Sequence, residues 1–176
     1  MVSTSIFMIV FRVVHILAAV LWVGAAWLFT FFLEPSLSAM GPAAGPLVQD
    51  LMEKRKVPIA IMMAATFTVL GGFFLYWHDW QAYGSLGDFV GSAFGVSLTV
   101  GAVAALAAYL AGFFGIKPRA ERMSALGKEM AAAGGPPSEA QLTEMRTIQE
   151  QMRVISRVDF VLLVIAVIGM ATARYW

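Results

Sequence analysis

Four long apolar runs dominate this chain and limit what it can fold into. They extend over residues 6–33, 57–77, 94–116 and 158–175. Each run approaches or exceeds the roughly 20 residues with which a helix crosses a bilayer core about 30 Å thick. Backbone polar groups in lipid must be paired within their own segment, so the runs predict transmembrane helices.

The composition agrees with a chain whose main surroundings are lipid. Hydrophobic residues make up 60% and charged residues 13%, against about 25% charged residues in soluble domains. The length of 176 residues predicts a single membrane domain, residues 1–176. A net charge of +1 argues against a nucleic-acid partner. The chain has no cysteine, which excludes disulfides, thiolate metal sites and cysteine nucleophiles.

Lysine and arginine gather in two of the three predicted loops. The first loop ends in Lys54, Arg55 and Lys56, residues 117–157 contain seven basic residues, and residues 78–93 contain none. Because loops rich in lysine and arginine stay in the cytoplasm, loops one and three should lie inside, with both termini outside. We therefore predict an all-α integral membrane four-helix bundle, N-out and C-out.

Residues 117–157 carry the pattern of a helical hairpin. Apolar residues recur at spacings of three and four on both sides of a Gly-Gly-Pro-Pro break at residues 134–137. Ser138 and Gln141 have the spacing of a capping box, in which each side chain bonds to the other residue's backbone N–H. We expect a cytoplasmic hairpin whose second helix continues into the fourth span.

Small residues predict close helix packing. The third span contains five of them at helical spacing: Gly101, Ala104, Ala105, Ala108 and Gly112. Gly71 and Gly72 form a similar surface in the second span. Small side chains allow helix backbones to approach each other closely in lipid.

Arg12 and His15 are the charged residue and the histidine within the first span, one helical turn apart. Charged groups and histidines in the hydrocarbon region are costly and therefore indicate functional sites. Two interpretations of His15 are open: a hydrogen bond to Thr66 or Thr68 on the second span, or a ligand or proton carrier. Arg12 is then either an interfacial anchor or the partner of an anionic ligand group, such as a haem propionate.

Asp159 begins the fourth span near its cytoplasmic end. We expect it to pair with Arg153 or Arg157, because charges near the interface cost little. His78 lies in the second loop, about 15 Å above His15 by helix rise, so the two histidines should not share one metal ion. If haem binds, methionine is the expected second ligand, or the iron is five-coordinate.

The segment from Phe11 to Ala25 reads FRVVHILAAVLWVGA. It resembles the opening of two related groups of bacterial membrane proteins, the copper-resistance protein D (CopD) family and the membrane-bound protoporphyrinogen oxidase of the HemJ type. Lys54, Arg55, Lys56 and Pro58 are also similar to the oxidase group. The resemblance implies four spans and implies His15 as a contact to haem b or copper. The third and fourth spans here begin without the Lys and the Asn-Glu pair of the oxidase group.

Three functions remain open from the sequence. The first is a redox-linked membrane protein that handles haem or copper through His15. The second is an accessory subunit of a larger membrane complex or homo-oligomer. The third is an enzyme of the protoporphyrinogen-oxidising type. Whether the protein is catalytic is left undecided.

Overall fold

The computed structural model describes residues 2–176, and within them all regular structure is helical. Four continuous helical stretches are long and apolar enough to cross a membrane: Ile6–Met40, Val57–Trp80, Ala93–Ala132 and Glu139–Tyr175. The prediction of an all-α chain with four helices of this kind is confirmed. Three of the stretches extend well beyond the apolar runs from which they were predicted.

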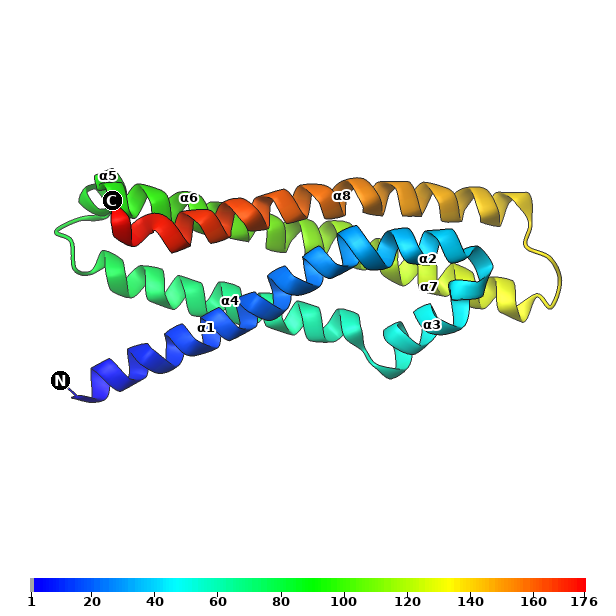
Figure 1. Cartoon of the computed structure of the whole chain (residues 1–176), viewed down its shortest axis with the longest axis horizontal. Helices are drawn as coiled ribbons and strands as arrows, with labels where there is room; N and C mark the ends of the chain where they lie inside the picture. The colour runs from blue at the N-terminus through cyan, green and yellow to red at the C-terminus, as the bar shows by residue number, and fades with distance from the viewer. Residues whose placement is uncertain (1) are drawn as a thin grey trace.

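The four long helices form two packed pairs (Figure 1). Helix α1 (Val2–Leu28) packs mainly against α4 (Val57–Trp80), and α6 (Ala93–Leu110) packs mainly against α8 (Glu139–Thr172). The start of α1 and the C-terminus lie at the same end of the bundle, and the short helix α5 (Leu86–Gly91) lies beside the C-terminus (Figure 1). We call this the terminal end.

The opposite end, which we call the hairpin end, is more elaborate than the sequence indicated. The first loop is itself mostly helical, in the order α2 (Glu34–Met40), η2 (Gly41–Ala44), α3 (Gly45–Gln49) and η3 (Asp50–Lys54). Helix α7 (Lys117–Ala132) lies at the same end and leads into the hairpin (Figure 1). The chain closes with the short turn η5 (Ala173–Tyr175).

Two π-helical turns connect the apolar helices to the hairpin end: η1 (Phe29–Leu33) after α1 and η4 (Ala111–Ile116) after α6. Pro35 and Pro118 follow them. In η1 the amide of Glu34 bonds to the oxygen of Phe29, five residues back. Proline has no N–H and cannot continue the α-helical hydrogen-bond pattern. The turn before each of these two prolines is therefore π-helical, with one more residue per hydrogen-bonded turn than an α-helix.

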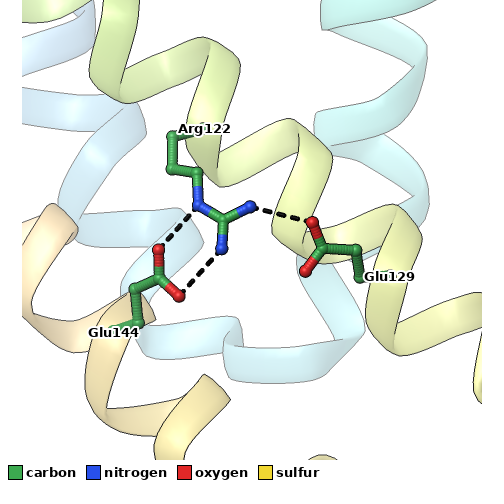
Figure 2. Close-up of polar contacts among 3 residues, drawn as sticks. All are labelled: Arg122, Glu129 and Glu144. Carbon is green, nitrogen blue, oxygen red and sulfur yellow. Dashed lines mark hydrogen bonds and ion pairs between the residues drawn. The ribbon is translucent and has the colours of Figure 1, made fainter.

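The hairpin forms as predicted. Ser138 and Gln141 make the expected capping box, and α8 then runs without a break to Thr172. Arg122 on α7 bonds Glu144 on α8 at 2.6 and 3.0 Å and Glu129 on its own helix at 2.8 Å (Figure 2). The Arg122 guanidinium holds the pKa of Glu144 below its usual value.

The core lies midway along the bundle. One cluster of buried side chains joins all four long helices: Trp22, Ala64, Ala65, Ala108 and Leu163. Farther toward the terminal end, α6 and α8 approach closely at two glycines. A Cβ atom on Gly169 would lie 2.8 Å from the Ser97 oxygen and 3.1 Å from the Gly101 Cα. The predicted close packing of the third span therefore occurs against α8.

Candidate functional site

His15 lies on the side of α1 that faces α4 and is half-buried. Its Nδ1 is 2.8 Å from the main-chain oxygen of Thr68. A carbonyl oxygen only accepts hydrogen bonds, so Nδ1 carries a proton and donates it. In the neutral ring Nε2 is then unprotonated and keeps its lone pair, which is the form in which histidine binds metals.

Two glycines on α4 make room for the imidazole. A Cβ atom on Gly71 would lie 3.3 Å from the His15 Cβ, and one on Gly72 would lie 2.9 Å from Cε1. The ring therefore runs along the glycine pair in direct contact with the α4 backbone. Any larger residue at position 72 would displace it.

The predicted hydrogen bond between His15 and the second span is present, but it uses the backbone of Thr68. The Thr68 hydroxyl is buried and donates to the oxygen of Ala64, 2.8 Å away. Thr66 turns away from His15: its hydroxyl lies 3.2 Å from the hydroxyl of Tyr109 on α6. Of the two candidate threonines, only Thr68 thus shares a hydrogen bond with the histidine, through its main-chain oxygen.

Arg12 is exposed on α1, one turn from His15 toward the terminal end. No ion pair involves it within residues 2–176. Beside it, the rings of Phe11 and Phe74 stack with centroids 4.3 Å apart, joining α1 to α4. The residues next to His15 on α1 and α4 thus include a guanidinium outside any ion pair in residues 2–176 and a stacked pair of aromatic rings.

Asp159 is a separate buried group on α8, with 5% of its surface exposed. Its Oδ1 has no hydrogen-bond partner in the described part of the chain. The prediction that it pairs with Arg153 or Arg157 is wrong. Arg153 instead donates to Glu34 at 2.9 Å, and Arg157 is exposed. Asp159 is buried in the bundle interior, whereas the side chains of Arg153 and Arg157 are exposed.

His78 lies at the end of α4, seven residues beyond Gly71, and its ring nitrogen is 3.5 Å from Asp79. At about 1.5 Å per residue this separates it from His15 by roughly 10 Å along the helix axis, less than the about 15 Å expected from the sequence. No group of three or more His, Asp or Glu side chains suited to a metal ion occurs within residues 2–176. A metal ion bound to His15 would therefore have no cluster of His, Asp or Glu side chains in residues 2–176 to complete its coordination.

The sequence pointed to His15 and Arg12 but missed two features of their surroundings. The first is the contact of His15 with Gly72. The Gly71-Gly72 pair in the sequence could have indicated that another helix approaches closely there. The second is the aromatic pair of Phe11 and Phe74, which no spacing rule connects. No protein-family model, curated protein or solved structure matches this chain.

Proposed function

We propose that this protein is a multi-pass protein of the bacterial cytoplasmic membrane, N-out and C-out, with the hairpin end in the cytoplasm. All lysines and arginines except Arg12 and Arg174 fall in the first loop or in residues 117–157. Those segments lie at the hairpin end of the bundle (Figure 1). The positive-inside rule then supports this orientation.

We further propose that the protein binds haem b in a redox-linked role, with His15 as the axial ligand. The observation that carries the proposal is the 2.8 Å hydrogen bond from Nδ1 of His15 to the Thr68 oxygen. Such a bond to the outer nitrogen orients a ligating imidazole and leaves Nε2 for the iron. When bound, haem supplies a one-electron couple.

The surroundings of His15 fit a haem better than a mononuclear copper ion. The macrocycle needs one strong axial ligand, apolar and aromatic contact, and a cation for its propionates. His15, the stacked Phe11 and Phe74, and Arg12 supply these three elements. A copper ion needs several converging ligands, and His15 belongs to no cluster of His, Asp or Glu in residues 2–176. Copper remains the alternative to test second.

The deciding experiment is an absorption spectrum of the purified protein, oxidised and then reduced with dithionite. The protein should be expressed with ample haem supply and extracted in mild detergent. We expect a Soret band with reduced α and β bands, lost in His15→Ala and kept in His78→Ala. Unchanged haem content in His15→Ala would refute the assignment, provided that both variants insert to the same level.

A second candidate function is an accessory subunit of a larger membrane complex or homo-oligomer. The specific observation is Arg12, which lies exposed on an apolar helix beside exposed Val13 and Ile16. A guanidinium at such a position is costly in lipid unless it meets a partner group. The test is cross-linking in native membranes: Arg12→Ala should lose a cross-linked species that Arg174→Ala keeps. A purely monomeric protein in membranes and in detergent would count against this function.

The third candidate is an enzyme that oxidises protoporphyrinogen, which rests on the resemblance of the first span. Its test is rescue of a bacterial strain that lacks this activity. Failure to rescue with well-inserted protein would remove this candidate without affecting haem binding at His15.

A further inference from the structure

Asp159 has the burial of a core residue and the chemistry of a charged one. It shares a face of α8 with Leu163 and Ala166, at helical spacings of four and three, and both of these residues are buried. Its Oδ1 is buried without a hydrogen-bond partner in the described residues. A carboxylate without a partner is too costly to hold in such a place, so the charge must be neutralised.

No ion pair joins Asp159 to a charged group of the neighbouring elements in the described residues. Arg153, on α8 itself, bonds to Glu34 at the start of α2. Lys117, after η4, lies 4.0 Å from Glu121 and over the ring of Phe113. On α8 the exposed Arg157 points out of the core, and before α4 the exposed Lys54, Arg55 and Lys56 lie at the start of the helix. Helix α6 contains no charged residue.

The turn η1 packs against the segment of α8 that contains Asp159. Phe31 of η1 contacts Phe160 of α8, with ring centroids 4.9 Å apart, which places the two segments side by side. On the buried sides of the same segments lie Thr30, 8% exposed, and Asp159. No hydrogen bond involves the Thr30 hydroxyl within the described residues. Other threonines of the long helical stretches bond to the carbonyl four residues back: Thr66, Thr68, Thr99, Thr143, Thr147 and Thr172.

The main-chain oxygen of Thr30 also lacks its helical donors. In an α-helix it would accept from the amide of Glu34, but that amide bonds to Phe29. In a π-helix it would accept from residue 35, which is proline and has no N–H. The contact between Phe31 and Phe160 thus brings the segment that carries the hydroxyl and main-chain oxygen of Thr30 alongside the segment of α8 that carries the Asp159 carboxylate. Hard cations prefer oxygen ligands of this kind.

We propose that Asp159 and Thr30 form a binding site for a small monovalent cation, a proton or Na⁺. The cation neutralises the buried carboxylate, and Thr30 supplies the remaining oxygen ligands. This site is independent of haem binding at His15.

The test is modification of the purified protein with dicyclohexylcarbodiimide, an apolar reagent that reacts with protonated carboxyls, read by mass spectrometry. We expect modification at Asp159, absent in Asp159→Asn. If the cation is Na⁺, sodium at fixed pH protects the residue and choline does not. If it is a proton alone, modification falls as the pH rises and is unaffected by sodium.

The variant Thr30→Val keeps the shape of the side chain and removes its hydroxyl. It should shift the midpoint for sodium or for pH by roughly two- to tenfold in cation concentration, the effect of one lost hydrogen bond. Leu37→Ala, on α2, is the control and should leave the midpoint unchanged. An unchanged midpoint in Thr30→Val would remove Thr30 from the site.

Melting temperatures provide a second readout in case the reagent does not reach the carboxyl. A bound cation stabilises the folded protein, so wild type should respond to sodium or to pH in a way that Asp159→Asn does not. If wild type and Asp159→Asn show the same dependence on both, the proposal is overturned.

Discussion

The imidazole of His15 donates from Nδ1 to the main-chain oxygen of Thr68 across 2.8 Å, which joins α1 to α4 over a sequence separation of 53 residues. The acceptor is a backbone atom, so no substitution of the Thr68 side chain removes it. The orientation of the ring therefore depends on how closely the two helices approach, which Gly71 and Gly72 determine.

Gly72→Ala should displace the His15 ring. The new Cβ would lie 2.9 Å from Cε1, and overpacking of this kind costs about 1–3 kcal/mol. We expect a lower melting temperature in detergent and, if haem binds at His15, a lower haem content per protein. Gly24→Ala is the matched control, because a Cβ there meets nothing within 4 Å. Equal melting temperatures for the two variants would show that the ring moves without cost.

The helices and the hairpin could be predicted from the sequence because their signals are local. Apolar runs of sufficient length gave the four long helices, and residues 138 and 141 gave the start of α8 through a cap that spans one turn. The helical first loop was not foreseen. Residues 34–54 contain Pro, Gly and Ser between short apolar pieces. The pieces form short helices, and Glu34 and Glu53 at the two ends of this loop bond to Arg153 and Lys128.

The candidate sites were only partly predictable because their partners are remote in the chain. Arg153 has Asp159 six residues away in sequence but bonds Glu34, 119 residues away. The orientation of α8 turns Asp159 inward and leaves the arginine at the hairpin end. Thr30 gave no signal by itself, since its unpaired oxygen follows from Pro35 together with the π-helical register.

Gly169→Ala should destabilise the packing of α6 against α8. Its Cβ would meet the Ser97 oxygen at 2.8 Å, and the α6 backbone cannot yield as a flexible side chain could. We expect a loss of about 1–3 kcal/mol, measured as unfolding in a denaturing detergent series. Gly127→Ala, whose Cβ would lie in open space on α7, serves as the control. A neutral Gly169→Ala would contradict the close crossing.

Arg122→Gln should destabilise the contact between α7 and α8 near neutral pH. It should also make the stability of the hairpin less dependent on acid pH. Arg122 lowers the pKa of Glu144 from an ordinary value of 4.5, so the pair stabilises the fold above that pH. The stabilisation is lost as the pH falls through the lowered pKa. Hydrogen exchange of α7 should therefore rise on acidification in wild type, and rise less in Arg122→Gln.

The control for the hairpin experiment is Arg146→Gln, because Arg146 is exposed on α8 and makes no ion pair within residues 2–176. It should exchange like wild type at both pH values. Identical acid responses in wild type and Arg122→Gln would show that another group causes the pH dependence. Glu53 is one such group, because Lys128 lowers its pKa through a 2.8 Å bond.

The proposed orientation can be tested with single cysteines, because the chain contains none of its own. Ala82→Cys lies in the turn after α4 and Ala132→Cys at the end of α7, and both positions are exposed. A maleimide that cannot cross membranes should label position 82 in intact cells. Position 132 should react only after the cells are opened. The C-terminal ends of α4 and α7 lie at opposite ends of the bundle (Figure 1), so the reverse pattern would invert the orientation. Labelling of both positions in intact cells would argue against a membrane-spanning arrangement.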